Sequence, residues 1–141
     1  LSSSGLIFAW DGEPPTVRTG ITWLARHRGN GLARNGVNSS TSGFAALNWA
    51  VRCGYDRILL LGYDYRNLNG RRHWYDDSSE PQAEPGRAVD LWSTWARAFD
   101  EVTPELQELG VEGRNAAPES AITAFPKCTI EEGLAWYDAL P

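Results

Sequence analysis

The stretch "NSSTSGFAALNWAVRCGYDRILLLGYDYR", residues 38–66, decides the fold class expected for this chain. It opens with a Ser/Thr/Gly cluster and ends in an apolar run that leads into Gly-Tyr-Asp. Between them, Phe44, Leu47 and Val51 fall at positions i, i+3 and i+7, the spacing that places apolar side chains on one face of a helix. The stretch therefore predicts a half-buried helix that begins near Ser42.

Both ends of this helix carry recognisable signals. Thr41 or Ser42 can cap the free N–H groups of the first turn, and Gly54 suits the position just after the last turn. The run that follows, Ile58 to Leu61, is apolar at every position. Such a run is typical of a strand covered on both faces, as in a parallel sheet with helices on each side.

The rest of the chain alternates strand-like and helix-like segments. From the N-terminus we expect a strand at 6–10, a long Arg/Gly-rich loop at 16–40 with one turn of helix at 21–26, a surface loop at 76–86, a helix at 88–99 that continues to 109, a strand at 111–115 and a helix at 130–140. A capping box, Thr129-x-x-Glu132, opens the last helix. This order predicts a single α/β domain over residues 1–141, three-layered, with a mostly parallel sheet flanked by helices in the manner of a Rossmann-like half.

Composition limits the function classes. The chain has 141 residues, of which 42% are hydrophobic, enough for one compact core. A pI of about 5.0 argues against duplex nucleic acid as a partner, and no apolar run approaches the roughly 18 residues of a membrane span. The N-terminus lacks the pattern of a signal peptide. We therefore expect a cytoplasmic protein, inside the host cell if a phage encodes it, with no membrane partner.

The charges are divided unevenly along the chain. Residues 1–55 carry five Arg against two acidic residues, a net charge of +3, whereas residues 56–141 carry eight basic against sixteen acidic residues, a net charge of −8. From Pro14 to Tyr55 there is no Asp or Glu. Such a basic segment inside an acidic chain indicates a local anion site. The simpler alternative is that these arginines solvate the face of a loop.

The Ser/Thr/Gly cluster is the expected location of this anion site. A helix N-terminus offers unpaired N–H groups and a partial positive charge, to which small polar residues let an anion approach closely. In open α/β sheets, ligands bind beyond the carboxyl ends of the strands, where Gly62 and Asp64 emerge here. Gly62 would let a ligand lie against the backbone, and Asp64 would bind a sugar hydroxyl or a metal. An ordinary capped helix followed by a core strand is the competing interpretation.

His73, in the segment "GRRHWYDD", is the second candidate. A histidine near neutral pKa can serve as a general base, and Asp76 or Asp77 beside it could position Mg²⁺ through water. A surface histidine beside aromatic residues is the simpler interpretation. Neither Cys53 nor Cys128 has metal-ligand or nucleophile spacing, so we expect free thiols.

Several segments together resemble known families. Residues 38–65 are similar to an N-x-S-G segment, a small-residue helix and G-x-x-x-I-x-L-x-G-x-D. This pattern recurs in the family 42 sialyltransferases, the Maf-type flagellin glycosylation proteins, the archaeal 6-hydroxymethyl-7,8-dihydropterin diphosphokinases and a set of tailed-phage proteins sometimes labelled norphogenetic. The phage group is the most similar, since "GRRHWYDD" resembles its G-R-x-H-W-F-G-D and "GVEGRNAAPESAITAFPKCTIEEGL" its closing G-V-x-x-x-N-x-x-x-x-S-x-L-x-x-F-P and helix. The resemblance covers about residues 36 to 135.

The resemblance implies a nucleotide site. In the sialyltransferases the T-S-G segment contacts the cytidine nucleotide donor and the G-x-D-F-Y segment lies near the sugar. Two departures weaken the comparison: the catalytic histidine of the sialyltransferases lies much further along the chain than His73 does, and no glycine-containing strand-turn-helix precedes residue 36 here. With Arg18 and Arg34 added as nearby cations, the candidate nucleotide and phosphate residues are Asn38, Ser40, Thr41, Ser42, Gly43, Gly62, Tyr65, Arg18 and Arg34, and the catalytic candidates are Asp64 and His73.

The leading hypothesis is a nucleotide- or nucleotide-sugar-binding domain of a phage protein that transfers a glycosyl or diphosphate group. The alternative is a non-catalytic binding or assembly module that keeps the fold. A third option, an accessory part whose other half carries the site, predicts an exposed sheet edge or self-association, so a homo-oligomer is among the expected states.

Overall fold

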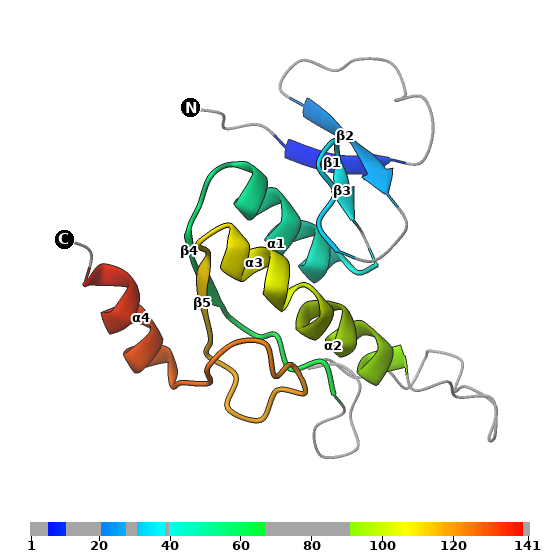
Figure 1. The fold of residues 1–141 in the computed structure, drawn as a ribbon. Helices are drawn as coiled ribbons and strands as arrows, with labels where there is room; N and C mark the ends of the chain where they lie inside the picture. The colour runs from blue at the N-terminus through cyan, green and yellow to red at the C-terminus, as the bar shows by residue number, and fades with distance from the viewer. Residues whose placement is uncertain (1–5, 11–20, 28–30, 39, 67–90, 140–141) are drawn as a thin grey trace, which may run out of the picture.

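The fold is seen in a computed structural model that describes residues 6–10, 21–27, 31–38, 40–66 and 91–139 (Figure 1). Strands and helices alternate in chain order as β1, β2, β3, α1, β4, α2, α3, β5 and α4. The predicted surface loop at 76–86 lies outside the described residues.

The first sheet is formed by β1 (Leu6–Trp10), β2 (Ile21–His27) and β3 (Val37–Asn38), in that order and parallel. The strand at 6–10 was predicted with these bounds. The predicted turn of helix at 21–26 is wrong, because these residues belong to β2, which pairs with β1 over residues 21–25 and with β3 at Arg26 and His27. Ile, Thr and Trp at the start of this segment favour a strand, and the long loop expected over 16–40 therefore contains two strands.

Helix α1 (Ser42–Arg52) forms as the sequence predicts. Thr41 is the N-cap residue, and its Oγ1 accepts the N–H of Phe44 at 3.1 Å. At the other end, Gly54 has a φ of +83°, a left-handed conformation that favours glycine. The cap and the glycine fix where α1 begins and ends.

A second sheet joins β4 (Arg57–Leu60) to β5 (Glu112–Asn115) in parallel. Between them the chain forms α2 (Leu91–Glu101) and α3 (Thr103–Glu108), and α4 (Ile130–Asp138) follows β5. Both bonds of the predicted capping box are present at the start of α4, since Glu132 N–H donates to Thr129 Oγ1 at 3.2 Å and Thr129 N–H to the Glu132 carboxylate at 2.8 Å.

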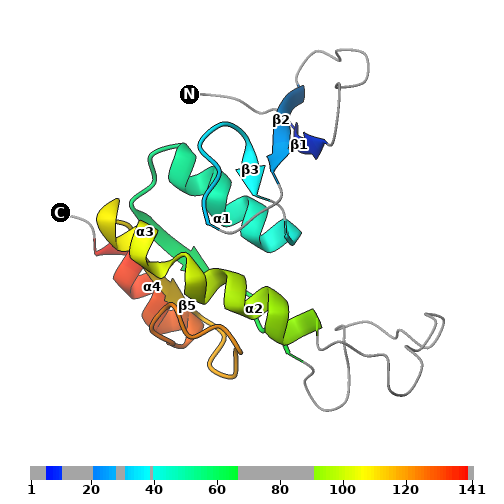
Figure 2. The same cartoon turned by 45° about the vertical axis from the view of Figure 1, so that its right-hand side comes forward.

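Helices cover both faces of the β4–β5 sheet. On one face, Ile58 and Leu60 pack into a core with α1, α2 and α3. The buried members from these helices, and from the residue between α2 and α3, are Phe44, Leu47, Ala96, Phe99, Val102 and Leu106. On the other face, α4 lies against the sheet, with Gly133 over Leu59 (Figure 2). The β1–β3 sheet lies on the far side of α1. The described residues therefore form two small parallel sheets, and a continuous three-layer sheet stays a prediction.

The cysteines and the lengths of the helices can also be read from the structure. Cys53 is exposed and Cys128 is buried, and both are free thiols. Within the described ranges, no helix is both long enough and apolar enough to cross a bilayer.

Candidate functional site

The end of β4 folds back onto the first turn of α1. The Tyr65 hydroxyl lies 2.6 Å from Thr41 Oγ1, and the Tyr63 hydroxyl donates to the carbonyl of Gly43 at 3.3 Å. The two ends of the stretch 38–66 therefore meet at one place. This is the junction at which the sequence places its candidate site, and we refer to residues 40–43 with residues 62–65 as the α1–β4 junction.

Gly43 is required by this junction. A Cβ atom at position 43 would lie 2.5 Å from the Tyr65 hydroxyl oxygen and 3.0 Å from Cε1 of Tyr63. Contacts this short do not occur without a shift of the rings. The small residue at position 43 thus makes room for two tyrosine rings, whereas the sequence analysis assigned that room to an anion.

Part of the first turn of α1 remains available. The N–H groups of Phe44 and Ala45 bond to Thr41, the first to its side chain and the second to its carbonyl at 2.9 Å. For the N–H groups of Ser42 and Gly43 the described residues provide no acceptor. The side chain of Ser42 is exposed. As far as the described residues show, these two N–H groups and the Ser42 hydroxyl are therefore available to an anion at the positive end of the helix dipole.

The two tyrosines are neutral in this environment. Burial raises the pKa of Tyr63 above its ordinary value of about 10. Burial is also the main cause that raises the pKa of Tyr65; the bond with Thr41 lowers it and the nearby Tyr63 raises it. Both hydroxyls thus stay protonated at neutral pH, so they add no negative charge that would repel an anion.

A loop from the far end of the chain holds Tyr63 and its neighbours in place. The Tyr63 carbonyl accepts from the side chains of Ser120 and Asn115, and the Asp64 carbonyl accepts from the N–H of Ala121 at 2.8 Å. Tyr65 has a φ of +49°, an unusual value for a residue other than glycine. The loop at 116–127 therefore fixes a strained backbone at the α1–β4 junction.

Asn115 has an unusual position in this arrangement. It is fully buried, and its Nδ2 donates to Tyr63 at 3.4 Å, but its Oδ1 finds no partner in the part of the chain that the structure describes. The sequence analysis did not select Asn115 or Ser120 as site residues. The signal was present, because these are the Asn and Ser of the closing motif G-V-x-x-x-N-x-x-x-x-S.

The structure places the predicted site residues in different environments. Thr41 and Gly43 lie against Tyr65 at the α1–β4 junction. Ser42, Gly62 and Asp64 belong to the same two segments, and Ser42 and Gly62 are exposed. Ser40, the first residue of the junction, is exposed.

Asn38 belongs to the interior instead. It is buried, its Nδ2 donates to the Gly31 carbonyl at 2.8 Å and its Oδ1 accepts from Ser40 N–H at 3.3 Å. Arg34 is exposed. Arg18 and His73, and with them Asp76 and Asp77 as Mg²⁺ ligands, lie outside the described residues. Elsewhere, the described residues hold no group of three His, Cys, Asp or Glu side chains arranged for a metal ion.

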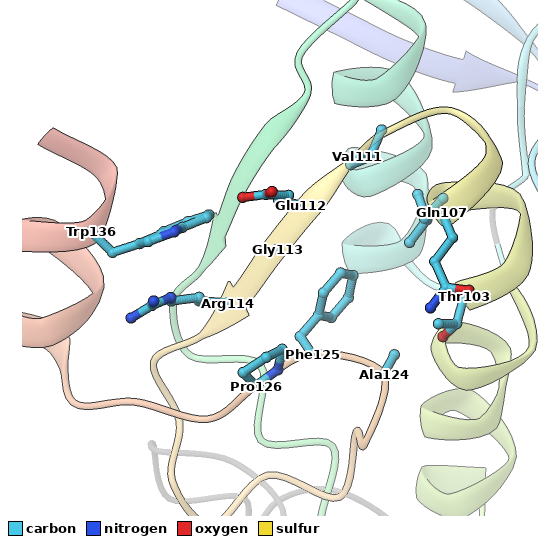
Figure 3. A pocket seen from close by; sticks show the side chains of 11 residues that line it. Thr103, Gln107, Val111, Glu112, Gly113, Arg114, Ala124, Phe125, Pro126 and Trp136 are labelled. Carbon is cyan, nitrogen blue, oxygen red and sulfur yellow. The ribbon is translucent and has the colours of Figure 1, made fainter. Parts of the chain in front are cut away.

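A separate hollow of about 310 Å³ lies at the edge of β5 that faces away from β4 (Figure 3). Phe125, Pro126 and Val111 form its apolar part, while Gln107 and Arg114 are at its rim. Arg114 and Arg57 both lie over the ring of Trp136, at 5.0 and 4.5 Å from its centroid. None of the residues selected from the sequence lines this hollow.

No protein-family model matches this chain, and no curated protein or solved structure matches it. The family resemblance therefore rests on the motifs themselves.

Proposed function

We propose that this chain binds a nucleotide or a nucleotide-sugar at the α1–β4 junction, with a phosphate group at the first turn of α1. The observation that carries the proposal is the 2.6 Å contact between Tyr65 and Thr41, which brings both halves of the candidate site together. The proposal includes a cytoplasmic location, in the host cell if a phage encodes the protein.

The phosphate contacts would come mainly from the backbone. The N–H groups of Ser42 and Gly43 donate to phosphate oxygens, and the hydroxyls of Ser40 and Ser42 extend this set. Because the helix dipole favours negative charge at this end, no lysine is required for binding.

The sugar part of the ligand would lie along the end of β4. Gly62 has a φ of +73° and open space where a side chain would be, so a ligand can approach its backbone. Asp64 is half-buried next to it and carries a carboxylate suited to accepting bonds from ribose or sugar hydroxyls. This arrangement matches the implied order of nucleotide at T-S-G and sugar at G-x-D.

A transfer reaction at this site would depend on positioning and on stabilising the leaving phosphate. Arg18, Arg34 and the general base His73 stay hypotheses for that step, with Mg²⁺ as an optional partner of the phosphates. The reaction class would be glycosyl or diphosphate transfer, as the resemblance implies.

One observation favours the non-catalytic alternative. Both tyrosine hydroxyls already bond to the first turn of α1, and Gly43 has no room beyond their rings. A module that keeps the fold for binding or assembly would retain such a closed junction. Nucleotide binding therefore distinguishes the proposed site from an assembly module.

The experiment is a titration with CMP, CDP, UDP, GDP and ATP, with and without Mg²⁺, followed by calorimetry and by melting temperature. We expect at least one nucleotide to bind and to raise the melting temperature by mass action. Ser42→Asp places a carboxylate where the phosphate would bind, while a first-turn acid suits the helix dipole. It should abolish binding without lowering the melting temperature of the free protein.

Ser93→Asp is the matched control, because Ser93 is exposed and is the third residue of α2. It adds the same charge to another helix and should leave nucleotide binding unchanged. Absence of binding by any of the five nucleotides at millimolar concentration would overturn the proposal and favour the assembly module.

A further inference from the structure

One edge of β4 is unpaired within the described ranges. The N–H of Glu112 donates to Asp56 at 2.7 Å and the N–H of Ala116 donates to Leu60 at 2.9 Å, so the even-numbered peptide groups of this strand face β5. Peptide groups alternate in direction along a strand. Those of Arg57, Leu59 and Leu61 therefore face the opposite edge, where the described residues place no other strand.

Helix α4 has an exposed apolar flank on the side of the unpaired β4 edge. Gly133 faces Leu59, and Trp136 reaches to the β5 side, where it lines the hollow in Figure 3. Ile130, Leu134 and Tyr137 follow a spacing of i, i+4 and i+7, and at 100° per residue they occupy the flank of α4 opposite Trp136. This flank therefore faces the unpaired edge of β4.

These three side chains are large and unusually accessible. Ile130 is 53% exposed, Leu134 46% and Tyr137 38%. Leu61, 52% exposed, lies two residues after Leu59 and so projects from the same face of the sheet, near the start of α4. We call these four residues and the unpaired edge of β4 the β4–α4 surface. Exposed apolar side chains beside an open strand edge are the features of an association surface.

We propose that the β4–α4 surface binds a second copy of this chain, with β4 pairing antiparallel to β4 and α4 packing against α4. A two-fold axis perpendicular to the sheet brings both features together in one operation, since each copy carries the edge and the helix flank in the same relation. The result is one four-stranded sheet with both α4 helices on the same face. This inference is independent of nucleotide binding.

The direction of the peptide groups selects a register. Centring the two strands on Leu59 pairs odd-numbered residues with odd-numbered residues, so every peptide group on the open edge finds a partner. In this register Arg57 of one copy lies opposite Leu61 of the other. Their Cβ atoms then lie directly opposite each other on the same face of the joined sheet.

The size and charge of the surface predict a weak dimer. The four apolar side chains expose on the order of 400 Å² per copy, against about 800 Å² per partner in a standard stable interface. Glu131 and Asp138 border the helix flank, and an antiparallel pair of α4 helices brings Glu131 of one copy near Asp138 of the other. Salt screens this repulsion, so association should strengthen as the salt concentration rises.

The test is sedimentation velocity over a protein concentration range that reaches about 0.5 mM. We expect a concentration-dependent monomer–dimer equilibrium. Leu134→Glu should weaken it by at least about tenfold, because a charge replaces an apolar contact at the interface. Leu109→Glu is the matched control, since Leu109 is 59% exposed at the end of α3, outside the surface, and should leave the equilibrium unchanged.

Two variants with opposite charges at position 61 test the register. Leu61→Lys places a cation opposite Arg57 of the second copy, whereas Leu61→Glu places a carboxylate there. Both variants lose the apolar contact, but the Lys variant should weaken the dimer several-fold more than the Glu variant. Each variant protein should melt at the temperature of the wild type, because these positions are exposed in the monomer.

A monomer at every concentration and salt level overturns the proposal. So does a dimer that Leu134→Glu leaves intact, because another surface would then form it. Equal effects of Lys and Glu at position 61 would overturn the antiparallel register.

Discussion

The hydroxyl of Tyr65 lies 2.6 Å from Oγ1 of Thr41, the residue that caps α1. One oxygen atom therefore serves two purposes, because Thr41 Oγ1 also accepts the N–H of Phe44. The start of a helix and the end of a strand, 24 residues apart, are joined at that atom.

Tyr65→Phe should destabilise the fold by about 1 kcal/mol, the usual effect of losing one intramolecular hydrogen bond. The ring contacts with Phe99 and Trp92 persist in this variant, so the loss is confined to the hydroxyl. Urea unfolding measures the effect. Tyr55→Phe serves as the control, because Tyr55 is 58% exposed, and a similar loss there would contradict the assignment.

Gly43→Ala should also destabilise the fold, against the preference of helices for alanine. The gain in helix propensity is about 1 kcal/mol, whereas overpacking against the two tyrosine rings costs about 1–3 kcal/mol. Combining it with Tyr65→Phe removes the oxygen that lies 2.5 Å from the added Cβ atom. The double variant should then recover part of the lost stability in a double-mutant cycle. Strict additivity would show that the hydroxyl is not the obstacle.

The fold should lose stability in alkali. Burial raises the pKa of Tyr63 and Tyr65 in the folded state above the unfolded value of about 10. The unfolded chain therefore loses these protons first, and stability falls as pH rises from about 10 through the folded pKa values. Unfolding followed from pH 8 to about 11 should show this loss, and Tyr63→Phe with Tyr65→Phe should make the pH dependence shallower. A wild type with unchanged stability over this range would contradict the burial of these hydroxyls.

Asp100 is expected to hold the loop that supports the α1–β4 junction. Its carboxylate accepts the N–H groups of Thr123 and Ala124 at 2.8 and 2.7 Å. Asp100→Ala should cost about 2–3 kcal/mol, because bonds to a charged acceptor are stronger than neutral ones. Asp100→Asn keeps an acceptor and should cost less. Chemical denaturation compares the two, and equal costs would show that the charge contributes nothing.

Local signals predicted much of the fold. The cap at Thr41, the glycine at position 54 and the capping box at Thr129 depend on neighbouring residues, so they are readable from the sequence and are confirmed in the structure. Strand β2 was missed because the Gly, Asn and Arg residues that follow it indicated a loop and outweighed the strand propensity of Ile21, Thr22 and Trp23.

The candidate site was predictable only in part. The sequence predicted that the start of α1 and the end of β4 lie near each other, through the general geometry of parallel sheets, and the contact between Thr41 and Tyr65 shows that these segments meet. It did not predict that Tyr63 would fill the space beside Gly43, since ring packing depends on the backbone at Tyr65. Asn115 and Ser120 act through a carbonyl more than 50 residues away, and such a contact leaves no local pattern.

The hydrogen bonds of Tyr63 also affect how the connected elements open locally. Its hydroxyl reaches α1, its carbonyl reaches the loop at 116–127, and that loop is attached to α2 through Asp100. Elements connected in this way tend to open together as one cooperative unit. Amide hydrogen exchange in the first helix and in the loop should therefore proceed at matched rates, so that a ligand which slows one slows the other.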